Sequence, residues 1–262
     1  MLRIIDGNNV IKRYFHTMGT DALLTLYLQS ISAYPAITTI IWAWDGVDSN
    51  ARRQAIYPEY KGKRPTSSDE FYQVRNLFKE MLTHSSCLSI EVPGYEADDV
   101  IAKIALGTEA PVEIVSSDVD FAALDKPNII LMTDYPSKIP RDQIKLYKVL
   151  VGDSSDNIPG LKGFGEVSWE NLRPEAFSLL QRFIQQTDTL WVDEVADELA
   201  RLGWKPGMVK NFREQAEMLR VFYQIVSFID VPDNLIEKHL KAGVLNQEWV
   251  YDKCNSLLFG GE

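Results

Sequence analysis

Apolar runs of strand length alternate with helical stretches through the first 150 residues, and this alternation leaves few folds open to the chain. The strand-like runs are LRIID, TTIIWAWD, CLSIEV, PVEIVSSD and NIILMT, at 2–6, 38–45, 87–92, 111–118 and 128–133. The helical stretches between them cover 20–33, 68–83, 96–106 and 119–124. Strands that alternate with helices predict an α/β fold, with a mostly parallel sheet and helices on both faces.

The character of the chain changes after residue 160, where strand-like runs nearly vanish. Helical segments are predicted at 175–186, 192–202 and 207–228, with Trp, Leu and Phe at the spacing of a packed helix face. We therefore predict a core over residues 1–150. A helical part over 151–262 is expected to pack on this core as one compact unit.

Composition limits the classes of partner. A net charge of −10 taken alone argues against nucleic acid, although acids gathered in one pocket would bias this sum. Cys87 and Cys254 give neither a disulfide framework nor a metal-ligand spacing, so thiols in a reducing compartment are expected. With no signal peptide and no membrane-length apolar run, we expect a cytoplasmic protein with no membrane partner.

Acidic residues follow nearly every predicted strand. The carboxyl ends of parallel strands meet at one edge of a sheet, so these acids are expected to converge there. Each acid alone has an ordinary alternative, because Asp6 could be a turn residue, while Glu96, Asp98 or Asp153 could cap a helix. The acids at strand ends and in adjoining loops are Asp6, Asp45, Glu96, Asp98, Asp99, Asp118, Asp120, Asp153 and Asp156.

Crowded carboxylates repel one another, so a cation is needed to neutralise them. With few His or Cys residues nearby, the donors are hard oxygens, which favour Mg²⁺ or Mn²⁺ over Zn²⁺. On a helix, Glu96 and Asp99 share a face, whereas Asp98 points towards a neighbouring ligand position or a water. The pattern predicts half of a cradle for two divalent ions, about 3.5–4 Å apart.

A glycine-rich stretch, GDSSDNIPGLKGFGEVSW at 152–169, separates two short helical pieces. It resembles a helix–hairpin–helix, whose backbone N–H groups hold DNA phosphates without reading bases. Neither the Rossmann nor the Walker pattern fits it. We expect Gly163 and Gly165 to need a positive φ or a close approach of phosphate.

A basic run, ARRQAIYPEYKGKR at 51–64, sets five cations against the single acid Glu59. A solvated surface is the alternative, but the position of the run just after Asp45 favours a phosphate-binding role. A second basic stretch, RLGWKPGMVKNFR at 201–213, could follow duplex phosphates or be an ordinary surface loop. The cations of the first run are Arg52, Arg53, Lys61, Lys63 and Arg64.

Several motifs together resemble the 5′-nuclease family of flap endonucleases, phage 5′-3′ exonucleases and 5′-nuclease domains of bacterial DNA polymerase I. The motifs are DGNNVIKR, YPEYKGKR, GYEADD, SSDVDF, GDSSDNIPGLKGFG and SFIDVP, in that order along the chain. The resemblance implies a PIN-like core with a basic arch or clamp at about 51–84 and a helix–three-turn–helix element. We expect a stand-alone phage or bacterial enzyme that hydrolyses DNA near 5′ flaps, free 5′ ends or junctions during replication or repair.

The resemblance also implies roles for residues. Asp6, Asp45, Glu96 and Asp98 would hold one ion, and Asp118, Asp120, Asp153 and Asp156 the other, with Asp99 between them or acting through water. Lys61 and Arg64 would grip the scissile phosphate, and Tyr60 would stack on a terminal base. The hairpin would seat K⁺ on carbonyl groups of Leu161, Gly163 and Phe164. The further implied DNA-binding residues are Arg13, Arg52, Arg53, Lys63, Gly160, Lys162, Gly163 and Gly165.

The sequence departs from the family pattern after the hairpin, where Glu166 and Glu170 replace the usual basic follow-on and predict a weaker or shifted duplex grip. A monomer is expected, and no clamp-binding motif is recognised. The alternative function is a non-catalytic binder of branched DNA with the same fold, which would gain nothing from acids that repel DNA. A small-molecule phosphatase would leave the glycine-rich hairpin without a role.

Overall fold

The computed structural model describes residues 1–18, 23, 25–27, 39–124, 126–132, 139–185 and 191–259. The predicted helix at 20–33 lies mostly outside these residues. Contacts divide the chain into a sheet unit (1–49, 65–136 and 229–262) and a helical unit (50–64 and 137–228). This division differs from the predicted boundary at residue 150, because the last segment returns to the sheet and residues 50–64 join the later helices.

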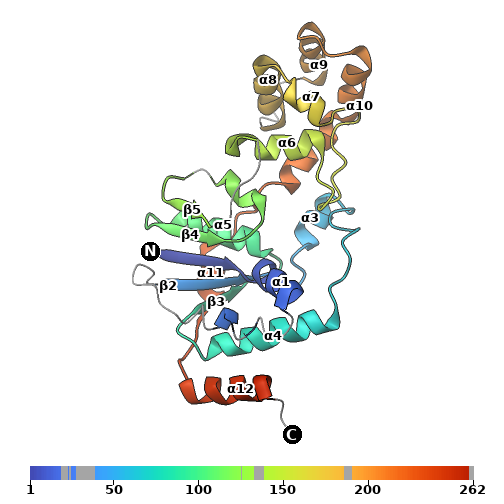
Figure 1. The fold of residues 1–262 in the computed structure, drawn as a ribbon. Helices are drawn as coiled ribbons and strands as arrows, with labels where there is room; N and C mark the ends of the chain where they lie inside the picture. The colour runs from blue at the N-terminus through green and yellow to red at the C-terminus, as the bar shows by residue number, and fades with distance from the viewer. Residues whose placement is uncertain are drawn as a thin grey trace. The chain divides into compact units, whose positions relative to one another are not determined.

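Six strands form the sheet, in the order β5-β4-β1-β2-β3-β6 (Figure 1). The first five pair in parallel and β6 lies antiparallel to β3, which confirms the predicted mostly parallel sheet. β6 was not predicted, because three residues are too few to show the alternation of a strand. The strands are β1 (Leu2–Asp6), β2 (Thr39–Trp44), β3 (Leu88–Glu91), β4 (Val112–Val115), β5 (Ile129–Leu131) and β6 (Leu240–Ala242).

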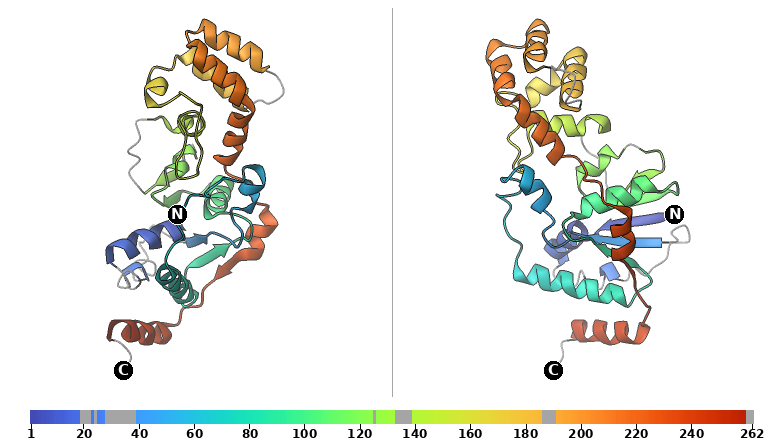
Figure 2. Two further views of the ribbon diagram at one scale, coloured as in Figure 1. Left: turned by 90° about the vertical axis from the view of Figure 1, so that its right-hand side faces the viewer. Right: turned by 180° about the vertical axis from the view of Figure 1, so that it is seen from behind.

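Helices cover both faces of this sheet. Figures 1 and 2 show α5 (Ala97–Gly107) on one side of the strands and α4 (Asp69–Thr83) on the other. Ile5, Trp42 and Trp44 join the core on the α4 side, where the ring centroids of Trp42 and Phe78 lie 4.8 Å apart. Because side chains alternate along a strand, the buried neighbours of these residues fill the other face. The remaining helices of this unit are α1 (Gly7–Met18), η2 (Val119–Ala123), α11 (Asp233–His239) and α12 (Gln247–Phe259).

α4 belongs to the core, although it lies in the region predicted as an arch or clamp at about 51–84. The Ser68 side chain caps its start by accepting from the N–H of Phe71 at 3.2 Å, and Asp69 and Glu70 lie in the first turn. Its apolar face is buried along its whole length. That face consists of Phe71, Val74, Phe78, Met81 and Leu82.

The helical unit packs around α10 (Pro206–Ile225), which contacts α3 (Ala51–Ile56), α6 (Ile144–Val151), α8 (Pro174–Gln185) and α9 (Val192–Arg201). Leu180, Phe183 and Phe212 are fully buried in its core. The predicted helices at 175–186, 192–202 and 207–228 are therefore confirmed as core-packing helices. α7 (Glu166–Glu170) and η3 (Arg141–Gln143) complete the unit. Among the described helices, none has both the length and the apolar character that crossing a bilayer requires.

Gly46 provides a test of how tightly the sheet unit is packed beside its strand ends. A Cβ there would lie 1.9 Å from the carbonyl oxygen of Val92, a rigid backbone atom. We expect Gly46→Ala to lower the free energy of unfolding by about 2–4 kcal/mol, measured by urea denaturation. Gly107→Ala is the matched control, because its Cβ would meet nothing within 4 Å. Equal urea midpoints for the two variants would contradict the packing described.

Candidate functional site

Three acids meet at the carboxyl ends of the central strands. Asp6 is the last residue of β1 and pairs with Ala43 of β2, which ends at Trp44, so Asp45 directly follows β2. Asp118 follows β4, the neighbour of β1 on its other side. The charges of Asp45 and Asp118 both act on Asp6. The structure therefore brings these three predicted residues together within the sheet unit.

Asp6 is the buried member of this group, with 5 % of its surface exposed. Its carboxylate accepts from the Asn9 backbone N–H at 3.1 Å and from the Ser116 hydroxyl at 2.9 Å. Burial raises the pKa of Asp6 to about 7, and the charges of Asp45 and Asp118 push in the same direction. The two donors oppose this rise without cancelling it. A nearby cation would relieve the cost of the ionised form.

Asp45 links the sheet to α5. Its Oδ2 accepts from the side-chain amide of Asn8 at 2.6 Å, and its Oδ1 accepts from the N–H of Ala97 at 2.9 Å. Asp45 thus binds an N–H at the helix start, whereas the side chain of Glu96, which stands at the N-cap position, makes no capping bond. The capping alternative for Glu96 is therefore not realised, and its side chain is buried.

Asp99 has a different environment from the one predicted. It is fully buried, and its Oδ1 accepts from the N–H of Ile229 at 2.7 Å. This contact fastens the segment that precedes α11. The predicted role of Asp99 between the two ions stays a prediction. Asp98, next to it on α5, is half-buried. The partner of Asp99 lies 130 positions away, so no local pattern could reveal it.

The loop after β4 is fastened to the DGNN segment. Asn9 Oδ1 accepts from both the N–H and the hydroxyl of Ser117, at 3.0 and 2.9 Å. Asp118 caps the short helix η2 by accepting from the N–H of Asp120 at 2.9 Å. Sequence reasoning missed the polar residues that orient the acids, although they directly adjoin Asp6 and Asp118 in DGNN and SSDVD. The missed residues are Asn8, Asn9, Ser116 and Ser117.

No three His, Cys, Asp or Glu side chains of the described residues lie in positions to share a metal ion. The carboxylates are instead turned towards the hydrogen-bond donors named above. The oxygens of a carboxylate offer about four acceptor positions, so these bonds leave capacity for a cation.

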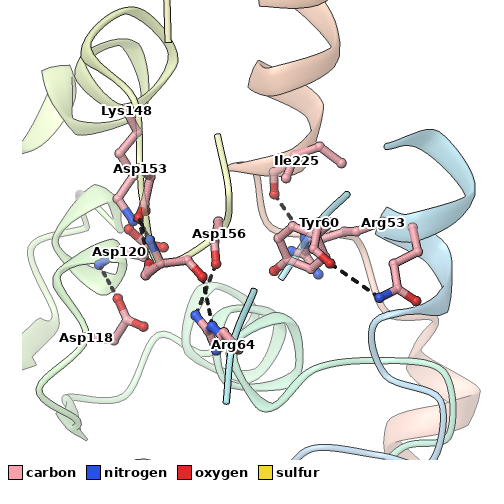
Figure 3. A network of polar contacts seen from close by, with 11 residues as sticks. Arg53, Tyr60, Arg64, Asp118, Asp120, Lys148, Asp153, Asp156 and Ile225 are labelled. Carbon is pink, nitrogen blue, oxygen red and sulfur yellow. Dashed lines mark hydrogen bonds and ion pairs between the residues drawn. The ribbon is translucent and has the colours of Figure 1, made fainter. Parts of the chain in front are cut away.

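A second pair of acids lies in the loop between α6 and the hairpin, within the helical unit. Figure 3 shows the Lys148 ammonium against Asp153, with a 2.8 Å distance from Nζ to Oδ2. The other oxygen of Asp153 accepts from the N–H and hydroxyl of Ser155. Burial alone would raise the pKa of Asp153, but Lys148 and Ser155 outweigh it and lower that pKa. Lys148 was missed, because it lies in an amphipathic helix that reads as ordinary packing.

Asp156 is 6 % exposed and pairs with Arg64, with 3.1 Å between the Arg64 guanidinium and Oδ1 (Figure 3). Burial raises the pKa of Asp156, and the charge of Lys61 opposes this rise. Lys61 has a φ of +55° and its N–H donates to the Asp156 carbonyl at 3.2 Å. The predicted phosphate-binding cations, Lys61 and Arg64, therefore lie beside Asp156.

Two predicted DNA contacts need correction, because their side chains are inside the helical unit. Tyr60 is 2 % exposed and belongs to the core, so its ring has no room to stack on a base. Arg53 is 4 % exposed and donates to the carbonyl of Ile225 at 3.0 Å (Figure 3). It also donates to the carbonyl of Ser227 at 3.0 Å. Its charge stabilises the carbonyl groups at the end of α10. By contrast, Arg13, Arg52 and Lys63 are exposed.

The hairpin glycines differ from one another. Gly160 and Gly163 have φ of +74° and +82°, which favours glycine, and a Cβ on Gly160 would meet the backbone of Val151 at 2.6 Å. Gly163 therefore has the positive φ expected, whereas Gly165 has a φ of −116° at the N-cap of α7, which leaves the close approach of phosphate as the alternative for Gly165. Leu161 and Phe164 are buried, and they flank the exposed tip.

The second basic stretch, 201–213, is largely paired with acids. Arg213 contacts Asp193 and Asp197 of α9, and Arg201 contacts Glu198 at 2.7 Å. The net positive charge that this stretch offers to a phosphate is therefore small, which favours the alternative of an ordinary surface loop.

Comparisons with known proteins agree with this arrangement. Residues 1–149 match the family model described as 5′-3′ exonuclease, N-terminal resolvase-like domain. DNA polymerase I of Bacillus caldotenax is 30 % identical over 228 residues, which cover 75 % of this chain and 25 % of that protein. Flap endonuclease Xni of Shewanella sp. (strain W3-18-1) is 27 % identical over 264 residues, covering 91 % of this chain and 94 % of the relative.

The structural comparison extends over nearly the whole chain. T5 5′-exonuclease, solved with bound zinc, has a TM-score of 0.66 and 19 % identity, and 98 % of each chain is covered. This chain spans about a quarter of the length of its DNA polymerase I relatives. The likeness to T5 5′-exonuclease supports the fold, including the helical part.

The raised pKa of Asp6 predicts how stability changes with pH in EDTA. Because the folded protein binds this proton more tightly, the resulting stabilisation is full below about pH 3.8 and is lost as pH rises through about 7. Asp6→Asn cannot ionise, so its free energy of unfolding should rise relative to the parent's between about pH 3.8 and 7. The difference should reach at most about 4 kcal/mol, from about 1.4 kcal/mol per pKa unit.

Urea denaturation at several pH values measures this difference. Glu109→Gln, at a position with a largely exposed side chain, is the control and should follow the parent. Parallel pH curves for Asp6→Asn and the parent would show that Asp6 ionises normally.

Proposed function

Because this chain belongs to the 5′-3′ exonuclease family matched by its first 149 residues, we propose that it is a divalent-metal-dependent nuclease that hydrolyses DNA near 5′ ends, flaps or junctions. The observation that carries the proposal is the buried Asp6 between Asp45 and Asp118 at the strand ends. A fold gains no stability from crowding ionised acids, so a cationic ligand accounts for this group best.

The donor chemistry fits hard divalent ions. All proposed ligands are carboxylates, which suit Mg²⁺ or Mn²⁺. Burial and the charges of Asp45 and Asp118 raise the pKa of Asp6, and a bound divalent ion would favour its ionised form. In the sheet unit the proposed donors are Asp6, Asp45, Glu96, Asp98, Asp118 and Asp120, and in the helical unit Asp153 and Asp156. Two ions, when bound, would supply activated water and stabilise the leaving oxygen.

The side chains around these donors have separate tasks. Asn8 and Ser116 hold Asp45 and Asp6 in fixed orientations through hydrogen bonds of 2.6 and 2.9 Å. Lys61 and Arg64 supply positive charge beside Asp156, where they can bind a phosphate oxygen. Lys148 and Arg64 neutralise Asp153 and Asp156 when no ion is present, so an ion that binds these acids competes with the two cations.

The hairpin and exposed cations account for the binding of DNA. Arg13, Arg52, Lys63 and Lys162 are exposed and can contact phosphates without reading bases. A K⁺ ion on the carbonyls of Leu161, Gly163 and Phe164 remains part of the proposal. The Leu161 carbonyl already accepts from the Phe164 N–H at 2.9 Å, which leaves one lone pair for such an ion. We propose a monomer that acts on 5′ flaps, free 5′ ends or branched DNA.

Metal dependence gives the primary test. With a labelled duplex carrying a 5′ single-stranded flap, we expect cleavage in Mg²⁺ or Mn²⁺ and none in EDTA. Ca²⁺ should support binding but block cleavage, because it takes more ligands at longer distances. Turnover that persists in EDTA, or no turnover with any of these ions, would contradict the proposal.

A double substitution tests the acids of the helical unit. Asp153→Asn with Asp156→Asn keeps acceptors for Ser155 and Arg64 but removes both charges. We expect the single-turnover rate to fall by roughly 10²-fold or more, with DNA affinity unchanged or tighter.

Asp193→Asn with Asp197→Asn is the matched control for this pair, because these two acids also pair with a cation in the same unit. Its cleavage rate should equal the parent's. An active Asp153/Asp156 variant would remove GDSSDN from the reaction.

A further inference from the structure

The tip of the glycine-rich hairpin is held by two side chains of one helix. The N–H of Lys162 donates to Gln215 Oε1 at 2.8 Å, and the carbonyl of Lys162 accepts from Asn211 Nδ2 at 2.8 Å. Asn211 and Gln215 are four residues apart on α10, so they lie on one face of that helix. Both backbone groups of a single exposed residue are thereby bound to α10.

The residues on either side of Lys162 are fixed by other means. Leu161 and Phe164 are buried at 2 % and 4 % exposure, and the Leu161 N–H donates to the Leu150 carbonyl at 2.8 Å. Between them, Gly163 has a φ of +82°. A Cβ added to Gly163 would lie 3.6 Å from Nδ2 of Asn211. The orientation of the tip peptides therefore depends on the two hydrogen bonds from α10.

These bonds also decide which N–H groups remain for a ligand. The N–H groups of Leu161, Lys162 and Phe164 are all donated within the helical unit. Those of Gly163 and Gly165 donate no hydrogen bond to any described residue. Both glycines are exposed.

We propose that Asn211 and Gln215 are positioning residues for the duplex part of the substrate. Because they bind the backbone N–H and the carbonyl of Lys162, they orient the N–H groups of Gly163 and Gly165 towards phosphate oxygens. This inference rests on the proposed function, because it assigns these two residues to the DNA grip of the same enzyme. It predicts that they act on affinity for duplex DNA and leave the chemical step unchanged.

Substitutions of matched shape separate positioning from surface charge. Gln215→Met removes the acceptor, whereas Gln215→Glu keeps it and adds a negative charge. Asn211→Leu removes the donor, and Asn211→Asp sets a carboxylate against the Lys162 carbonyl. Affinity is measured with a labelled blunt duplex in Ca²⁺, and chemistry with the flap substrate in Mg²⁺ at saturating enzyme.

We expect Gln215→Met and Asn211→Leu each to weaken duplex affinity by roughly three- to tenfold, the effect of one net hydrogen bond. Gln215→Glu should bind more tightly than Gln215→Met despite its charge, and Asn211→Asp should bind least well. Saturated single-turnover rates should match the parent's. The Lys162 amide should exchange its hydrogen faster in Gln215→Met but not in Gln215→Glu.

Gln185→Met is the control, because Gln185 donates to the Tyr223 hydroxyl in the same unit at 3.1 Å, outside the hairpin. The inference is overturned if Gln215→Glu binds duplex less well than Gln215→Met, or if all variants bind like the parent. If Gln215→Met fails to fold, the duplex affinities of Gln215→Glu and Asn211→Asp decide the test. A parent that binds duplex but never cleaves the flap would refute the proposed function, while the order of affinities still tests the inference.

Discussion

The burial of Asp6 at the end of the central strand is the constraint around which the sheet unit is arranged. An ionised carboxylate there is costly, and Asp45 and Asp118 make it costlier. The surrounding chain answers with donors: the Asn9 N–H and the Ser116 hydroxyl reach Asp6, while Asn8 and the start of α5 reach Asp45. These bonds tie the DGNN segment, the loop after β4 and α5 into one polar network. The need to hold acids close together therefore explains much of the local backbone at this edge.

The helical unit handles its acids differently. Here the cations Lys148 and Arg64 neutralise the charges of Asp153 and Asp156. Hydrogen-bond donors perform this task only in part. Arg64 comes from a segment about 90 positions earlier in the sequence. In the loop it also donates to the Ser155 carbonyl at 2.9 Å. Such pairs give little net stability where they are exposed, because water screens them. Their value is to keep the loop compact while leaving its charge near zero.

Much of this arrangement could be predicted from the sequence. Long apolar runs predicted β1 to β5, and the acids following β1, β2 and β4 predicted the edge at which Asp6, Asp45 and Asp118 meet. The failures have a common cause, which is that the deciding contact is distant in sequence. Arg53 and Tyr60 read as a surface grip because the carbonyls that Arg53 binds come 172 and 174 positions later, and because most of the core around Tyr60 comes from residue 146 onward. The bond between Asp99 and Ile229 was missed for the same reason.

The division of the chain has a consequence for its synthesis on the ribosome. The helical unit combines 50–64 with 137–228, and the sheet unit receives β6 only from 240–242. When residues 50–64 leave the exit tunnel, the helices that will enclose Tyr60 and Arg53 do not yet exist. This segment must wait in water, carrying a tyrosine and an arginine destined for the interior, until α10 has been made. The nascent chain can therefore complete neither unit in order of emergence, because the helical unit needs residues up to 228 and the sheet unit needs β6 at 240–242.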